Sequence, residues 1–494
     1  MSNRTTWNSN FAFLMAMIGS AVGLGNIWRF PYIFYTYGQG TFLIPYILAV
    51  LILGLPFLLI EYSLGYKFKD SLINIFGKIS DKLQIVGWAV LLVIFFITTY
   101  YVCIVGWDML YLALSFFKGW GANPDAFFVN NVLQAVPLTD VVSGASGFSF
   151  VPAILVAVLI LWVVLWVISS RDLNDGVGAV SKVLVPLLFI LIVGIVAFSL
   201  TLPGASVGLH QFFTADWSAL MDLNLWLCAF GQIVFSLSLG MGIVLIYSSY
   251  LPEGTDLTKN ALITICANCG FEIFNAIGIF AILGFMVSST GVPFNELITE
   301  GTGLAFVAFP QVFNVMGPAA IIIGPIFFLC ILIAGITSAI ALLESVSSSV
   351  SDKFGFSRKK SVSIICALGF IVTALFTTTV GSDLITIFDA LLNNIILIFL
   401  IICQCIIVGY IYYIDDLIEV LNKKSILPVG NWWKYLVKYI TPIVLAILWI
   451  SGFKTYLIDG TAIEITVRVI IILVVIVASL ALYYVTKKKK SLNS

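Results

Sequence analysis

Residues 17–31 read Met17-Ile-Gly-Ser-Ala-Val-Gly-Leu-Gly-Asn-Ile-Trp-Arg-Phe-Pro31 and lie in an apolar segment, 11–37, that is long enough to cross a bilayer. Three glycines, Gly19, Gly23 and Gly25, interrupt this segment, and each costs about 1 kcal/mol relative to alanine in a helix interior. Unwound backbone within a membrane must find partners such as ions, water or a bound solute. The segment therefore predicts a helix broken around a polar ligand, although its Gly-x-x-x-Gly spacing is equally typical of close helix–helix contact.

The composition is that of a protein that spans a membrane. Of its 494 residues, 61% are hydrophobic and 10% are charged, and the net charge is zero. These proportions exclude an ordinary soluble domain, and the balanced charge gives no reason to expect a nucleic-acid partner. The eight cysteines lie almost wholly in apolar segments, and the only histidine, His210, lies in an expected loop. We therefore expect reduced, packed thiols and no enzyme built on histidine or a metal centre.

Twelve apolar spans are expected along the chain. They lie near residues 11–37, 41–66, 84–117, 151–169, 178–201, 224–250, 258–287, 317–350, 361–379, 384–414, 435–453 and 464–486. With the N-terminus in the cytoplasm, all basic residues lie on that side except Arg29, Lys118, Lys454 and Arg468, which satisfies the positive-inside rule. We therefore expect a multi-pass protein of the plasma membrane with both termini in the cytoplasm, and its short tails favour a prokaryotic source.

A second span is interrupted in the same way as the first. It reads Gly231-Gln-Ile-Val-Phe-Ser-Leu-Ser-Leu-Gly-Met-Gly242, with glycines and hydroxyl groups in the middle of the span. Two such spans in corresponding halves of a chain indicate a transporter built from inverted repeats, with its binding site between the halves. Residues 288–316 are amphipathic and are expected to fold back as a lid, and residues 415–431 are typical of an interfacial helix.

Few ionisable side chains lie within the expected spans. Charge inside a membrane is costly, so each of them is a candidate for function, with a packed structural pair as the alternative. We expect structural pairs for Glu61 and Glu344. The remaining candidates are Arg29, Glu272 and Asp389, with Asp108 near the end of a span.

Several motifs, taken in order, resemble those of the neurotransmitter:sodium symporter family. Within this family, the resemblance is to the prokaryotic amino-acid transporters of the LeuT type. They are residues 19–31 in the first span, Tyr100-Tyr101 in the third, Gly176 and Pro186 in the fifth, Ser236-Leu-Ser-Leu-Gly-Met-Gly242 in the sixth and Ala334-Gly-Ile-Thr-Ser338 in the eighth. The resemblance implies an all-α polytopic membrane protein with a LeuT-like fold, in which twelve transmembrane helices include a 5+5 inverted repeat with broken helices 1 and 6.

The resemblance also divides the chain into parts. These are a cytoplasmic N-terminal latch (1–10), the first repeat with spans one to five (11–201), an extracellular loop (202–223), the second repeat with spans six to ten (224–414), spans eleven and twelve with the cytoplasmic loop before them (415–486), and a basic cytoplasmic tail (487–494).

The family implies two co-transported sodium ions, for which oxygen ligands are suitable. By position, the first ion would bind the substrate carboxylate together with the Ala21 carbonyl, Asn26, Ser236 and Asn268. The second would bind the carbonyls of Gly19, Val22 and Ala334 and the hydroxyls of Thr337 and Ser338. The alternative for those two hydroxyls is a hydrogen bond back to their own helix.

The implied substrate site lies at the first break. A carboxylate would meet the N–H groups near Leu24 and Gly25, at the start of the outer half-helix, together with the Tyr101 hydroxyl. Gly23 stands where monoamine-carrying relatives have aspartate, so an amino acid fits better. The expected substrate-binding residues are Ser20, Ala21, Gly23, Leu24, Gly25, Ile97, Tyr101, Phe235, Ser236, Ser238, Met241, Ser338 and Leu342. Most of the side-chain pocket is apolar, and the adaptable Met241 favours large side chains.

Further positions resemble the gates of the family. Arg29 and Asp389 match an outer ion pair above an aromatic lid, and Arg4 and Asp352 match an inner latch that is supported by Trp7. The Gly-x9-Pro stretch from Gly176 to Pro186 would let the fifth helix unwind and admit water to the second sodium site.

Glu272 lies one helical turn beyond Asn268. With Tyr46 and Gln232, it matches the surroundings of chloride in chloride-dependent members, which have a neutral residue in its place. The carboxylate would supply the negative charge itself, which implies transport without chloride. The alternative is a protonated acid that is hydrogen-bonded in the core.

The sequence therefore favours a sodium-coupled symporter that imports large aliphatic or aromatic L-amino acids by alternating access. The alternative is a non-transporting membrane sensor or accessory protein that kept the fold. Intact ion ligands and gates at both faces argue against that alternative, and two gates argue against a channel.

Overall fold

The computed structural model describes residues 5–299 and 301–492, which form a bundle of helices. In the first half of the chain the helices that build the bundle are α1 (Asn10–Ala21), α2 (Leu24–Thr36), α3 (Leu43–Ala49), α4 (Leu55–Phe68), α6 (Gln84–Ser115), α9 (Pro152–Ser169) and α10 (Ala179–Ser199). In the second half they are α12 (Leu223–Ser236), α13 (Ile243–Ser249), α14 (Leu257–Thr290), α17 (Ala320–Phe354), α18 (Arg358–Phe376), α19 (Gly381–Leu391), α20 (Ile398–Ile406), α23 (Thr441–Phe453) and α24 (Ala462–Leu492).

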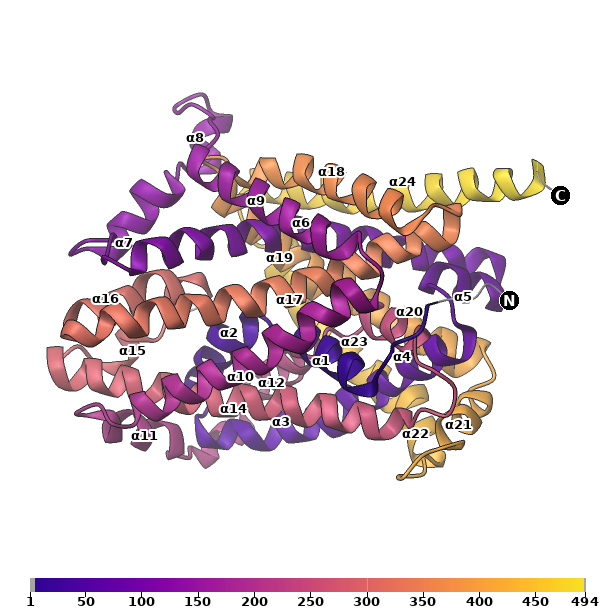
Figure 1. Cartoon of the computed structure of the whole chain (residues 1–494), viewed down its shortest axis with the longest axis horizontal. Helices are drawn as coiled ribbons and strands as arrows, with labels where there is room; N and C mark the ends of the chain where they lie inside the picture. The colour runs from indigo at the N-terminus through magenta and orange to yellow at the C-terminus, as the bar shows by residue number, and fades with distance from the viewer. Residues whose placement is uncertain (1–4, 300, 493–494) are drawn as a thin grey trace.

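Shorter helices cover the two ends of the bundle (Figure 1). At one end lie α7 (Pro124–Phe127), α11 (Ala205–Phe213), α15 (Phe294–Leu297) and α16 (Phe309–Val315). At the other end lie α5 (Leu72–Ile79), α21 (Asp415–Asn422) and α22 (Asn431–Tyr435), together with both ends of the described chain.

The predicted fold class, an all-α polytopic membrane protein, is confirmed. Ten helical segments of the described chain are long and apolar enough to cross a membrane, and α1 and α2 form a further pair that is bent by 50°. The predicted number of twelve is not reached by length alone, because α12 and α13 have only 14 and 7 residues on either side of their break.

The first break is narrower than the glycine cluster that predicted it. α1 ends at Ala21 and α2 begins at Leu24, so only Val22 and Gly23 leave the helix, both in extended conformation. Gly19 remains helical, and its missing side chain serves packing: a methyl group there would lie 2.7 Å from Val185 Cγ2 and 3.2 Å from Thr337 Cβ. The segment therefore combines the two alternatives, a broken helix and a close helix contact.

The second break is wider and depends more on glycine. Residues 237–242 separate α12 from α13, and Gly240 and Gly242 there have φ angles of 74° and 64°. In this left-handed region a side chain is unfavourable, so glycine is required. The N–H of Gly242 has left the helix, and it donates to Glu61 Oε1 of α4 at 3.0 Å. Glu61 therefore accepts a hydrogen bond from the backbone instead of forming the expected structural pair with another side chain. Glu344 does form such a pair, with Arg358 at 2.6 Å.

The extracellular loop that was predicted at 202–223 is largely helical. It contains α11, which places His210 in a helix rather than in a loop. α11 packs against α14 so closely that a methyl group at Gly208 would lie 1.7 Å from the carbonyl oxygen of Phe280. Gly284 of α14 faces the same contact.

We predict that α13 depends on an equally close contact with Gly65 of α4. A methyl group there would lie 2.0 Å from the carbonyl oxygen of Leu245, so Gly65→Ala should displace α13 and lower the free energy of unfolding by about 1–3 kcal/mol, as overpacking does. Gly270→Ala is the control, because among the described residues the added methyl group would meet nothing within 4 Å apart from its chain neighbours and the adjacent backbone of its own helix. Thermal unfolding in detergent tests this, and equal melting temperatures for the two variants would contradict it.

Candidate functional site

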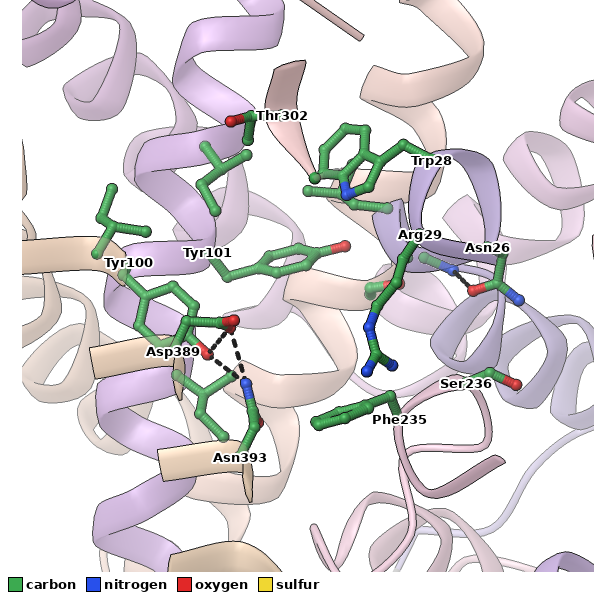
Figure 2. Close-up of a pocket in the computed structure, with 18 of the residues that line it drawn as sticks. Asn26, Trp28, Arg29, Tyr100, Tyr101, Phe235, Ser236, Thr302, Asp389 and Asn393 are labelled. Atoms are coloured by element: carbon green, nitrogen blue, oxygen red, sulfur yellow. Dashed lines mark hydrogen bonds between the residues drawn. The ribbon is translucent and has the colours of Figure 1, made fainter. Parts of the chain in front are cut away.

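The two breaks face a central cavity of about 630 Å³. All the residues that the sequence predicted to bind substrate line this cavity: Ser20, Ala21, Gly23, Leu24, Gly25, Ile97, Tyr101, Phe235, Ser236, Ser238, Met241, Ser338 and Leu342. Figure 2 shows Tyr101 extending from α6 toward Arg29, while Tyr100, from the same helix, lies beside Asp389 and Asn393.

The region around Gly23 presents donors without partners. The helix α2 starts at Leu24, so the N–H groups of Leu24 and Gly25 have no acceptor within their own helix, whereas the Asn26 N–H donates to the Gly23 carbonyl at 3.2 Å. The Gly23 N–H donates to Asn26 Oδ1 at 3.0 Å, which fixes the start of α2. The Tyr101 hydroxyl is buried and makes none of the hydrogen bonds found among the described residues. A helix N-terminus beside a free hydroxyl is suited to an anionic group.

The residues that were predicted to hold the first sodium ion lie together. Asn26 Nδ2 donates to Asn268 Oδ1 at 2.8 Å, and Asn268 Nδ2 donates to Ser236 Oγ at 2.7 Å. The three side chains are buried and come from α2, α14 and the end of α12. Rotation of the amides would present their oxygens to a cation.

The residues that were predicted to hold the second sodium ion also lie together. Ser338 Oγ of α17 donates to the carbonyl oxygens of Gly19 and Val22 at 3.2 and 3.4 Å. Thr337 Oγ1 donates to the carbonyls of Ile333 and Ala334, which is the bonding to its own helix that we kept as the alternative. The cluster offers only oxygen ligands, which suits a hard cation such as Na⁺.

The predicted outer ion pair is not formed in this structure. The Arg29 guanidinium donates from Nη1 to Gln232 Oε1 at 3.0 Å and lies 4.4 Å above the centre of the Phe235 ring. Asp389 accepts hydrogen bonds from Tyr100 and Asn393 instead. The two charged groups lie on opposite sides of the cavity (Figure 2), and their role as an outer gate stays a prediction.

At the end of the bundle where the described chain begins, Trp7 anchors this first segment. Its indole N–H donates to the Tyr247 carbonyl at 2.9 Å, and its ring packs edge-on against Tyr247 and Tyr250. Asp352 lies near the end of α17. Arg4 lies outside the described residues, so the inner latch between Arg4 and Asp352 stays a prediction.

Glu272 lies fully buried among the neighbours that the sequence predicted. The Tyr46 hydroxyl donates to Oε2, and Gln232 Nε2 donates to Oε1 at 2.7 Å. Because Gln232 also accepts from Arg29, one amide connects the buried acid to the outer gate. Gly176 lies in the π-helical turn η5 (Asn174–Gly178), and Pro186 lies inside α10. These irregularities are where unwinding of the fifth span was expected.

Sequence reasoning missed the outer wall of the cavity. Trp28, Ile104, Trp107 and Phe128 are apolar residues that no pattern separates from ordinary core. Thr302 belongs to the segment that was expected to act as a lid, and its amphipathic character was the only signal. Asn393 follows Asp389 by four positions, which is one helical turn.

Comparison with known proteins identifies the family. The Sodium:neurotransmitter symporter family matches residues 4–137 and 122–488. The chain belongs to this family. It is 39% identical over 472 residues to an uncharacterized sodium-dependent transporter of Methanocaldococcus jannaschii, covering 93% of this chain and 95% of that protein. The protein is therefore a multi-pass membrane protein of a sodium-dependent transporter family and not a member of an enzyme family.

More distant relatives have other names. The mouse sodium- and chloride-dependent creatine transporter 1 is 28% identical over 506 residues, which cover 92% of this chain and 77% of the relative. The sodium-dependent serotonin transporter of Drosophila melanogaster is 28% identical over 485 residues, with the same coverage. Sodium dependence is thus common to the names of these relatives, whereas substrate and chloride differ.

We predict that Ser338 contributes to sodium binding. Ser338→Ala removes the hydroxyl that touches the Gly19 and Val22 carbonyls, so half-maximal thermal stabilisation should require about tenfold more sodium, the effect of losing about 1.4 kcal/mol of binding free energy. Ser349→Ala is the control, because that buried hydroxyl bonds only to Ser345 in its own helix. Equal sodium requirements in the two variants, measured against choline, would refute the assignment.

Proposed function

We propose that the protein is a sodium-coupled symporter that imports large aliphatic or aromatic L-amino acids by alternating access, without a requirement for chloride. The observation that carries this proposal is the space around Gly23. A methyl group on Gly23 would lie 3.1 Å from Ser338 Oγ and 3.3 Å from the Tyr101 hydroxyl. The space in front of Tyr101 is therefore open because residue 23 has no side chain.

That space suits the carboxylate of an amino acid. The Tyr101 hydroxyl makes none of the hydrogen bonds found among the described residues, and the N–H groups of Leu24 and Gly25 provide further donors and the positive end of a helix dipole. The carboxylate would also complete the first sodium site beside Asn26, Ser236 and Asn268. Direct contact between ion and substrate would couple their binding by about 1–3 kcal/mol.

The opposite part of the cavity suits a large apolar side chain. It is lined by Ile97, Phe235, Met241 and Leu342, with Ser238 as a polar neighbour. Burial of apolar surface contributes about 25 cal/mol per Å², so leucine or tryptophan gains more here than glycine or alanine. The unbranched Met241 can adjust to side chains of different shape.

Two oxygen-lined clusters support the binding of two sodium ions. The first involves Ala21, Asn26, Ser236 and Asn268, and the second involves Gly19, Val22, Ala334, Thr337 and Ser338. The buried Glu272 supports independence from chloride, because its carboxylate is already surrounded by the donors of Tyr46 and Gln232. An anion beside it would be repelled.

An uptake experiment tests the proposal against the alternative of a non-transporting sensor. Purified protein in proteoliposomes is given radiolabelled leucine or tryptophan with an inward sodium gradient. We expect accumulation that disappears when choline replaces sodium. Sodium-dependent binding without accumulation would favour the sensor, and the absence of binding for any of the twenty amino acids would overturn the proposed substrate class.

Gly23→Asp should prevent amino-acid binding. The new carboxylate would occupy the space in front of Tyr101 and repel the substrate carboxylate, which we expect to weaken leucine binding by at least about 100-fold. Gly231→Ala in α12 is the control, since its added methyl group would contact no described residue beyond the adjacent part of α12 within 4 Å. The measurement is equilibrium binding of labelled leucine in sodium, and unchanged binding by Gly23→Asp would place the carboxylate elsewhere.

Chloride independence gives a separate prediction. Wild-type uptake should be the same in chloride and in gluconate medium, whereas Glu272→Ser should transport only when chloride is present. The serine keeps a hydroxyl beside Tyr46 and Gln232 but removes the negative charge, so an external anion must replace it. Wild-type uptake that disappears in gluconate would disprove this role of Glu272.

A further inference from the structure

Asp389 is held at two points on its side of the cavity. The Tyr100 hydroxyl donates to Asp389 Oδ1 at 2.8 Å, and Asn393 Nδ2 donates to the same oxygen at 2.8 Å. Asn393 Nδ2 also donates to the Tyr100 oxygen at 2.9 Å, which closes a triangle of hydrogen bonds (Figure 2). Because both donors use Oδ1, the Oδ2 atom accepts none of the hydrogen bonds found among the described residues. The carboxylate is thus fixed in direction while one oxygen stays available.

The side chain of Asn393 leaves a second acceptor available. A carboxylate only accepts hydrogen bonds, so the amide nitrogen must face Asp389 and the amide oxygen must point away from it. That oxygen, Asn393 Oδ1, is buried and has no hydrogen-bond partner among the described residues. Buried polar atoms are normally paired, and Asn393 lies on the wall of the cavity. A donor is therefore missing at this position.

The backbone places the two acceptors together. Asp389 lies in α19, and Asn393 follows it in the π-helical turn η9 (Leu392–Leu397). Their spacing of four residues brings side chains to the same helix face. Single π-helical turns within membrane helices often occur at functional sites.

Arg29 is the available donor on the other side of the cavity. It makes one hydrogen bond, to Gln232, and otherwise lies over the Phe235 ring. A guanidinium carries five N–H donors in a planar arrangement, so it can serve two acceptors at once. Figure 2 shows Arg29 and Phe235 opposite Asp389 and Asn393, with Tyr101 between the two sides.

We propose that Asp389 Oδ2 and Asn393 Oδ1 together receive the Arg29 guanidinium when the outer gate closes. Asp389 supplies the charge and one acceptor, and Asn393 supplies the second acceptor while its nitrogen keeps Asp389 in place. Asn393 is therefore a positioning residue of the gate, and Arg29 is the part that moves. This inference rests on the proposed transport function, because gate closure over a bound amino acid is a step of that cycle.

Asn394 provides a matched control. It lies on the same helical turn and lines the same cavity, but its amide donates to the Ala390 carbonyl of its own helix at 3.0 Å. Leucine has the same branched shape as asparagine, with a larger volume and no hydrogen-bonding groups. The pair Asn393→Leu and Asn394→Leu therefore separates the loss of the gate contact from a general change of this wall.

The first experiment measures how fast bound substrate leaves. The purified full-length protein is loaded with radiolabelled leucine in sodium, and dissociation is followed after dilution into unlabelled leucine. We expect dissociation to be about tenfold faster in Asn393→Leu, the effect of losing one hydrogen bond to a charged group, and unchanged within about twofold in Asn394→Leu. In an Arg29→Ala background, Asn393→Leu should have no further effect, because both changes remove the same contact.

The second experiment follows the gate itself. Ile104→Cys places a thiol on the cavity wall in a background without the native cysteines that are exposed or partly buried, which are Cys228, Cys266, Cys269 and Cys403. In the presence of sodium, the addition of leucine should slow the modification of this thiol by a membrane-impermeant reagent. We expect the same slowing when Asn394→Leu is added to this background, and none when Asn393→Leu is added. If the larger side chain of Asn393→Leu prevents folding, Asn393→Ser replaces it in this experiment. Its side chain is too short to reach both partners, so leucine should not slow the thiol modification in this variant either.

The outcomes distinguish this inference from the proposed function. If no amino acid slows thiol modification in the otherwise unaltered chain, the proposed function fails. If leucine slows modification equally in the presence and absence of the Asn393 amide, only the role of Asn393 is overturned. Equal dissociation rates in Asn393→Leu and Asn394→Leu, or an added effect in the Arg29→Ala background, would overturn it too.

Discussion

Backbone that leaves a helix inside a membrane must be hydrogen-bonded by something other than lipid, and this constraint explains most of the centre of this protein. At the first break, Asn26 accepts from the Gly23 N–H and Ser338 donates to the Gly19 and Val22 carbonyls. At the second, Glu61 accepts from the Gly242 N–H and Gln404 donates to the Gly240 carbonyl. Each break is therefore fixed by side chains of neighbouring helices, which must be polar at a depth where polar groups are otherwise unfavourable.

The same groups link the shape of the breaks to what binds there. A sodium ion at Ser338 would replace hydrogen bonds to two carbonyls by direct coordination, so ion occupancy and helix geometry cannot change independently. Gln232 extends this linkage, because it touches both the Arg29 guanidinium and the Glu272 carboxylate. A member of a sodium-dependent transporter family needs such linkage, since gates that opened without regard to the ions would dissipate the gradient.

The sequence could predict the elements whose cause is local. Hydropathy predicted the long helices, and glycines predicted both breaks, but only packing decides that Gly19 stays helical while Gly23 does not. The two ion clusters and the cavity lining followed from the resemblance of motifs rather than from spacing. The partners of Arg29 and Asp389 could not be predicted, because they depend on side-chain rotamers and on which gate is open. Asn393 also gave no clear signal, since an asparagine one turn from an aspartate is common on helices.

The contact between α11 and α14 has a consequence for how motion could be observed. The backbones of Gly208 and Gly284 approach so closely that the two helices must travel as one body. α14 also carries Asn275, whose amide donates to the Asn26 and Ile27 carbonyls of α2. A fluorescent label on the surface of α11 would thus report displacements of α2 without touching the cavity. A binding protein raised against α11 would restrain that helix from a distance.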